Sequence, residues 1–113
     1  MLTLYHGRTS ASSIKTRLAL AEKGVSFDSR VMTLRGDQFD PGYMQLNPNA
    51  VVPTIVHDGR VVIESTVIMH YADEAFPGPA PALMPADPLA RSQARMMTKL
   101  MDEYVHVACT RWR

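Results

Sequence analysis

The chain has 113 residues, of which 46% are hydrophobic and 20% are charged, a composition typical of one globular domain and not of a disordered segment. Its formal net charge of +1 excludes the concentrated basic face with which nucleic-acid-binding proteins contact phosphate groups. No apolar run approaches the ~20 residues of a membrane span, and the N-terminus lacks a signal-peptide pattern. A single cysteine, Cys109, leaves no disulfide within the chain. We therefore expect a soluble cytoplasmic protein.

The first part of the chain predicts a strand, a helix and a second strand. Leu2–His6 alternates apolar and polar residues, as a short half-buried strand does. After a loop rich in Gly, Thr and Ser, apolar residues recur at helical spacing from about Ser13, and Gly24 follows as a helix C-cap. Val25–Met32 returns to strand-like alternation. The apolar positions that define the helix are Ile14, Leu18, Leu20 and Ala21.

The next segment is polar and contains glycine, and it leads to a hairpin. We expect a loop over Leu34–Gly42 and one helical turn over Tyr43–Leu46. Asp58-Gly59 then separates the apolar runs Thr54–His57 and Arg60–Ile63. This is the strongest short-range hairpin signal, because a type I′ turn needs positive φ at both central residues.

Two features flank the predicted hairpin. Val52-Pro53 puts a proline directly before the first strand, where proline is tolerated, and an X-Pro bond can be cis. A cis bond would turn the Val52 N–H and C=O outward, free to pair with an extended ligand. At the other end, Ser65 is an N-cap candidate for a helix that Pro77 stops, and a helix N-terminus offers free N–H groups to an anion. The apolar face of this helix consists of Val67, Ile68, Tyr71, Ala72 and Ala75.

The remaining chain predicts a linker and one further helix. Five of the eight prolines fall within Phe76–Pro88, so we expect a stiff linker over residues 77–88. Leu89–Arg111 carries a broad apolar stripe rich in methionine, typical of the first helix of an all-α domain that is incomplete over residues 89–113. The exposed stripe predicts poor solubility or self-association.

Together these elements predict an α/β fold over residues 1–76. A strand, helix and strand form a right-handed parallel crossover, and the hairpin adds antiparallel strands. We therefore expect a four-stranded mixed sheet with flanking helices, followed by the linker and the last helix.

The serines before the first helix are candidates for anion chemistry. A hydroxyl of Ser10, Ser12 or Ser13 could donate a hydrogen bond to a thiolate, beside the free N–H groups of the helix end. Lowering a thiol pKa by two units corresponds to about 2.7 kcal/mol, which one charge-assisted hydrogen bond and the helix dipole can supply. Serine is also favoured as a plain N-cap, so the spacing leaves both roles open. The four histidines are scattered, and we expect no metal site.

As a set, these residues resemble the glutathione S-transferase family, in its N-terminal thioredoxin-like domain. The order and spacing of the matching segments agree over about residues 2–76. The resemblance implies a thioredoxin-like βαβ-ββα sheet and glutathione as co-substrate. The segments are Leu4-Tyr5-His6 with the serine loop, Thr16–Gly24, Asn47-Pro48, Val52-Pro53-Thr54, Asp58-Gly59 and Glu64-Ser65.

The resemblance implies a binding site for the glutathione tripeptide. Val52, before Pro53, would pair its backbone with the cysteinyl unit. Glu64 and Ser65 would hold the γ-glutamyl end, with Glu64 near the ammonium group and the Ser65 N–H near the carboxylate. Gln38 would face the glycine end.

The resemblance also points to a catalytic residue. Aligned through Arg17, Ser10 takes the position where serine-type members carry the hydroxyl that stabilises the glutathione thiolate. Tyr5 is a rival, since tyrosine-type members use a phenol near the end of the first strand, and Ser12 is a second rival. With no cysteine nearby, mixed-disulfide chemistry is not expected.

The implied function is that of a glutathione transferase, which activates the glutathione thiol for attack on an electrophilic, apolar substrate. The resemblance also implies a cytoplasmic enzyme of detoxification that is a homodimer in its full-length form. A chain that stops in its second domain is expected to be weakly active or inactive. One alternative is a non-catalytic, transferase-like binding or regulatory module. Another is a glutathione-dependent isomerase of zeta-like type, although Ser12 stands where that class has cysteine. No metal, nucleic-acid partner or membrane partner is expected.

Overall fold

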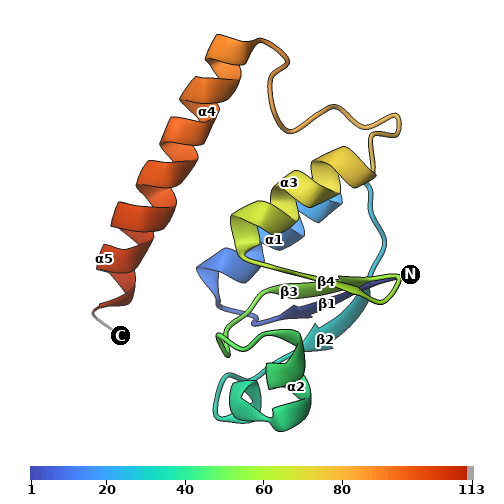
Figure 1. Ribbon diagram of the computed structural model, residues 1–113, viewed down its shortest axis with the longest axis vertical. Helices are drawn as coiled ribbons and strands as arrows, with labels where there is room; N and C mark the ends of the chain where they lie inside the picture. The colour runs from blue at the N-terminus through green and yellow to red at the C-terminus, as the bar shows by residue number, and fades with distance from the viewer. Residues whose placement is uncertain (112–113) are drawn as a thin grey trace. The chain divides into compact units, whose positions relative to one another are not determined.

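The computed structural model describes residues 1–111, and the chain divides into two compact units, Met1–Pro81 and Ala82–Arg113. The division falls inside the segment 77–88 that the sequence predicts as a linker. All strands of the described residues lie in the first unit, as Figure 1 shows.

The first unit is built on a four-stranded mixed sheet in the order β2-β1-β3-β4. β1 (Leu2–His6) pairs in parallel with β2 (Asp28–Val31), and antiparallel with β3 (Thr54–His57). β3 continues through a hairpin into β4 (Arg60–Ile63). This topology confirms the predicted thioredoxin-like fold, and it places the C-terminal end of β1 beside the N-terminal end of β3.

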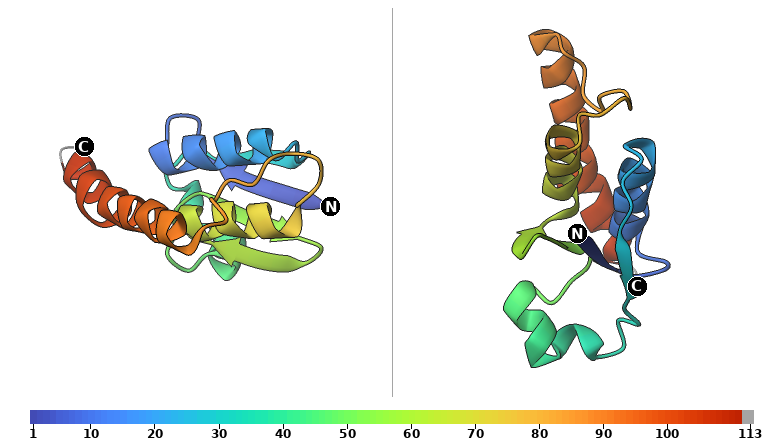
Figure 2. Two further views of the ribbon diagram at one scale, coloured as in Figure 1. Left: turned by 90° about the horizontal axis from the view of Figure 1, so that it is seen from above. Right: turned by 90° about the vertical axis from the view of Figure 1, so that its right-hand side faces the viewer.

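Helices cover both faces of the sheet. α1 (Ala11–Glu22) and α3 (Ser65–Ala75) lie side by side on one face, and α2 (Pro41–Leu46) lies on the other (Figure 1 and Figure 2). Successive strand residues point to opposite faces, so each face has its own apolar core. The main core consists of Leu2, Leu4, Leu20, Ile55, Ile68 and Ala72, and the smaller core of Met32, Tyr43 and Val52.

The buried face of α1 differs from the predicted one. Ile14 and Leu18 are 41% and 63% exposed, whereas Ser13 and Thr16 are fully buried. Both hydroxyls are tolerated there because each finds a backbone partner, Ser13 Oγ accepting from the Gly7 N–H and Thr16 Oγ1 donating to the Ser12 carbonyl. The helix itself was therefore predicted correctly, but its inward face was not, because of the predicted apolar positions only Leu20 is buried and hydroxyl-bearing residues form much of that face.

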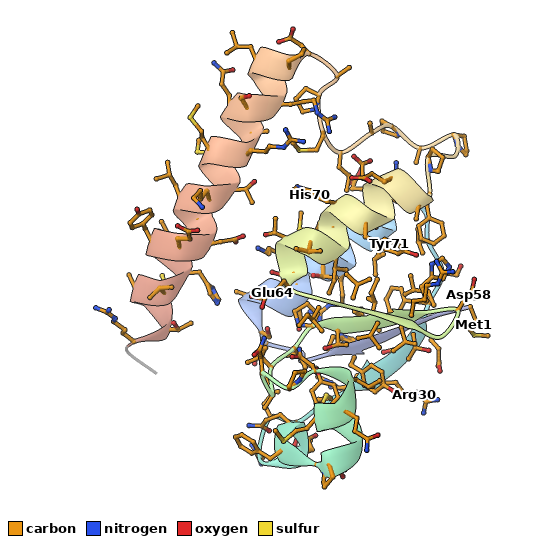
Figure 3. All side chains as sticks on the ribbon, in the orientation of Figure 1. Met1, Arg30, Asp58, Glu64, His70 and Tyr71 are labelled. Carbon is orange, nitrogen blue, oxygen red and sulfur yellow. The ribbon has the colours of Figure 1, made fainter. Side chains whose placement is uncertain are left out.

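The hairpin has the predicted bounds, and its two central residues, Asp58 and Gly59, both have positive φ, at 50° and 81°. The Met1 ammonium group pairs with the Asp58 carboxylate at this turn, as Figure 3 shows.

Between β2 and β3 the structure contains more helix than predicted. A 3-10 turn, η1 (Asp37–Phe39), interrupts the expected loop, and α2 begins at Pro41.

The second unit is a helix with an irregular turn. α4 (Pro88–Leu100) begins directly after its N-cap residue, Asp87. A π-helical turn, η2 (Met101–Val105), joins α4 to α5 (His106–Thr110). Met96, Met97 and the other apolar side chains of the predicted stripe are exposed. No helix in the part of the chain that the structure describes is long and apolar enough to cross a membrane.

Candidate functional site

Hydrogen bonds join the loop between β1 and α1 to the first turn of α1. The sequence placed Ser12 and Ser13 in the loop before the helix. The structure differs, because α1 begins at Ala11 and both serines lie in its first turn. Ser10 is the N-cap, and its Oγ accepts a hydrogen bond of 3.2 Å from the Ser13 N–H. The buried Ser13 Oγ in turn accepts from the Gly7 N–H at 3.1 Å.

The loop lies against the segment that precedes β3. A Cβ atom placed on Gly7 would lie 3.4 Å from Ser10 Cβ and 3.5 Å from Val52 Cγ2. It would also lie only 3.0 Å from Leu34 Cδ1, a distance so short that the Leu34 side chain would have to shift. Gly7 therefore permits a close approach of three segments, and it brings Ser10 and Val52 together.

The Val52-Pro53 bond is cis, the isomer that the sequence leaves possible at this X-Pro bond. Val52 is buried, and its side chain belongs to the smaller core. Among the hydrogen bonds of residues 1–111, none involves the backbone N–H or C=O of Val52. Both groups therefore keep the pairing capacity that the sequence predicted for an extended ligand.

A buried cluster of polar side chains, formed by Tyr43, Asn47 and Thr54, holds the turn before Val52. Asn47 is 1% exposed, and its Nδ2 donates to the Val51 carbonyl at 3.1 Å and to Thr54 Oγ1 at 3.0 Å. The Tyr43 hydroxyl donates to the same Val51 carbonyl, so Thr54 must donate its own proton to Tyr43 Oη, 2.8 Å away. Burial raises the pKa of Tyr43, which keeps the phenol neutral.

The start of α3 differs from the prediction at one residue. Glu64, and not Ser65, is the N-cap, and Ser65 is the first helical residue. The Ser65 N–H is thus one of the helix-end groups without an acceptor inside the helix. Glu64 is exposed and has φ of 73°, a left-handed conformation that side chains rarely adopt and that often marks ligand sites.

Glu64 and Ser65 lie at the same end of the sheet as Ser10 and Val52. Ile63, which precedes Glu64, pairs with Thr54, and Thr54 pairs with Tyr5 near the end of β1. Figure 3 shows Glu64 at the start of α3, far from Met1 and Asp58 at the hairpin turn. The N-terminal halves of α1 and α3 are also joined, since Lys15 Nζ donates to Thr66 Oγ1 at 3.1 Å.

The other predicted site residues are placed less centrally. The Tyr5 ring packs against the Tyr43 ring, with centroids 5.5 Å apart, on the sheet face that α2 covers. Ser12 is partly buried in the first turn of α1. Gln38 lies in η1, where its Oε1 accepts from the Gly36 N–H at 2.9 Å, and no hydrogen bond within residues 1–111 joins its side chain to Ser10, Val52 or Glu64.

The loop that carries Leu34 is held by a carboxylate that sequence reasoning did not identify. Asp37 accepts from the N–H groups of Thr33 and Leu34 at 2.8 and 2.9 Å. These bonds, the one from Thr33 foremost, lower the pKa of the half-buried Asp37 carboxyl. Leu34 itself has φ of 61° and its side chain reaches Gly7, so Asp37 holds the loop that packs against Gly7.

The candidate site consists of backbone groups, a hydroxyl and a carboxylate. Among residues 1–111, no three His, Cys, Asp or Glu side chains are grouped so that they could hold a metal ion. What the described residues offer is a strand edge at Val52, a hydroxyl at a helix start and a carboxylate beside a second helix start. These groups suit a small extended molecule that carries both an amine and a carboxylate.

Comparisons of the sequence with known proteins point to one family. The sequence model of the family described as "Glutathione S-transferase, N-terminal domain" matches residues 9–75. Protein LigF of Sphingobium sp. is 40% identical over 104 residues, which are 91% of this chain and 40% of that protein. Maleylacetoacetate isomerase of Pseudomonas aeruginosa is 36% identical over 109 residues, 93% of this chain and 50% of that protein.

Solved structures give the same result. The crystal structure of beta-etherase LigF superposes with a TM-score of 0.84 at 39% identity, over 91% of this chain and 43% of that one. A glutathione transferase homologue from Sulfitobacter, solved with bound glutathione, gives a TM-score of 0.86 at 26% identity, over 100% of this chain and 57% of that one. The chain thus spans 40% and 50% of the length of the two curated relatives.

Proposed function

The chain belongs to the glutathione S-transferase family, and on that basis we propose that it binds glutathione and activates its thiol for attack on an electrophilic, apolar substrate. The observation that carries the proposal is the position of Ser10, Val52 and Glu64 at one end of the sheet. The Sulfitobacter relative, which was solved with bound glutathione, supports the choice of ligand.

We assign each end of the tripeptide to a different part of this site. The unpaired Val52 backbone pairs with the cysteinyl unit, as a strand edge pairs with an extended peptide. The Ser65 N–H receives the γ-glutamyl carboxylate at the start of α3, and Glu64 receives the ammonium group. Gln38 faces the glycine end, through the amide nitrogen that its bond to Gly36 leaves available.

Ser10 is the residue that we assign to the thiol. A serine hydroxyl has one donor and two acceptor positions, and the bond from the Ser13 N–H uses only an acceptor. The Ser10 proton therefore remains available for a thiolate. Ser13 is unsuitable, because its side chain is fully buried. A hydrogen bond to the charged form of the thiol, together with the N-terminus of α1, lowers the thiol pKa.

The proposal is tested by titrating the chain with glutathione by calorimetry and recording the ultraviolet absorbance of the bound thiolate against pH. We expect saturable binding and a thiol pKa below that of free glutathione. Absence of binding would refute the glutathione site. Binding with an unshifted thiol pKa would favour the alternative of a non-catalytic binding module.

Glu64 provides a separate test of the γ-glutamyl end. Glu64→Gln removes the negative charge and keeps the shape, and we expect glutathione affinity to fall about tenfold, as for one lost charge-assisted hydrogen bond at an exposed position. Calorimetry gives the affinity. Glu74→Gln, at an exposed position of the same helix, is the matched control and should leave affinity unchanged. Equal affinities for both variants would remove Glu64 from the site.

A glutathione-dependent isomerase is the second candidate, favoured by the similarity to maleylacetoacetate isomerase. A transferase consumes the thiol in proportion to product, whereas an isomerase returns it. Measuring free thiol during turnover of candidate electrophiles separates the two reactions. We further propose a homodimeric, cytoplasmic enzyme of detoxification, and sedimentation analysis tests the dimer.

A further inference from the structure

A chain of hydrogen bonds centred on Arg17 holds the loop that carries Ser10. Arg17 Nη1 lies 2.9 Å from the Gly7 carbonyl and 2.8 Å from His6 Nδ1, and Nη2 lies 3.1 Å from the Arg8 carbonyl. Arg17 therefore fastens two consecutive peptide groups of the loop to α1. The Gly7 peptide is held on its other side by Ser13, one helical turn before Arg17.

The protonation state of His6 follows from these partners. A guanidinium group only donates, so His6 Nδ1 must accept from Arg17 and carry no proton. The proton of the neutral ring is then on Nε2, which donates to Ser29 Oγ on β2 at 2.6 Å. A protonated ring would present an N–H to the Arg17 N–H and break the contact.

The surroundings of His6 keep it in this state. His6 is 7% exposed, with Arg17 on the α1 side, the Ser29 hydroxyl on the β2 side and the Phe27 ring in an edge-to-face arrangement beside it. Burial and the Arg17 charge both lower the pKa of His6. His6 is therefore neutral at physiological pH and works as a fixed acceptor.

We propose that His6 and Arg17 are positioning residues, which align the Gly7–Arg8 peptide groups and thereby set the direction in which Ser10 presents its hydroxyl. The inference rests on the proposed function, since Ser10 is the group that is positioned. Neither side chain touches glutathione in this scheme. Their effect is on the thiol pKa and not on affinity for the γ-glutamyl end.

The first test concerns the chain without glutathione. Nitrogen-15 spectra of the His6 ring should show the Nε2–H form, with protonation only below the usual histidine range. Arg17→Lys keeps the charge but cannot serve three acceptors in one plane, so the amide shifts of residues 7–10 should change. An Nδ1–H ring, or unchanged loop shifts in Arg17→Lys, would overturn the inference whether or not glutathione binds.

The second test measures the thiol pKa of bound glutathione. We expect Arg17→Lys and His6→Leu each to raise it by about one unit, a tenfold change in the ionisation constant, with little change in affinity for S-methylglutathione, which has no thiol proton. His6→Asn can restore an acceptor to Arg17, and its thiol pKa should return toward the original value. Arg60→Lys, at an exposed position of β4 at the opposite end of the sheet, is the matched control.

The outcomes separate positioning from a merely structural role. A lower melting temperature for Arg17→Lys and His6→Leu with an unchanged thiol pKa would overturn the inference. A raised thiol pKa that His6→Asn reverses would support it. Failure of the original chain to bind glutathione would refute the proposed function, and the loop shifts of the first test would still decide on the role of Arg17.

Discussion

Ser10→Ala is expected to raise the pKa of the bound glutathione thiol by about two units, equivalent to about 2.7 kcal/mol. The variant removes the hydroxyl whose proton remains available in the structure, while the N-terminus of α1 and the Val52 backbone stay in place. Affinity for S-methylglutathione should therefore change little. The thiolate absorbance of bound glutathione, recorded across pH, gives the result directly.

Controls for this prediction address the cap and the two rivals. Ser10 also caps α1, so the alanine variant should lose about 1 kcal/mol of stability, and Ser10→Thr, which keeps both cap and hydroxyl, should restore stability and thiol pKa together. Ser12→Ala and Tyr5→Phe should leave the thiol pKa unchanged. A normal thiol pKa in Ser10→Ala with a raised one in Tyr5→Phe would transfer the role to the phenol.

Asn47→Ala is expected to give the largest loss of stability, about 3 kcal/mol of the free energy of unfolding. The substitution removes two donated hydrogen bonds and the bond that Oδ1 accepts from the Asn49 N–H at 3.0 Å. It also leaves a cavity at a residue that is 1% exposed. The Thr54 hydroxyl then loses a donor in a place that water does not reach.

Denaturant unfolding of both proteins measures this effect, with Asn49→Ala as control. The Asn49 side chain is exposed and only its backbone N–H is used, so its removal should change stability by less than about 0.5 kcal/mol. Since Asn47 anchors the carbonyl of Val51, its loss should also weaken glutathione binding. Equal stabilities of the two variants would show that the buried cluster contributes little.

Much of the fold was predictable because its signals are local. The Asp58-Gly59 turn predicts the bounds of the hairpin to the residue, and the division between the two units falls inside the proline-rich segment. The inward face of α1 was not predictable from hydrophobicity. Ser13 and Thr16 are buried because backbone partners exist for them, and such partners become visible only in three dimensions.

The candidate site divides in the same way. A family pattern in the sequence predicts a site at Ser10, Val52 and Glu64-Ser65, and the structure brings these segments to one end of the sheet. The supporting residues Gly7, Asn47 and Arg17 were not assigned to the site. Their roles depend on contacts that form only in the folded structure, and the spacing of residues along the sequence does not predict those contacts.

The site gathers three segments that are distant in the chain, and this has a thermodynamic consequence. The loop before α1, the turn before β3 and the start of α3 meet only when β1 pairs with β3 and the two helices dock. An unfolded chain offers glutathione no comparable surface. By mass action, glutathione at 100 times its dissociation constant would stabilise the folded unit by about 2.7 kcal/mol, so the ligand would also raise the melting temperature of the unit.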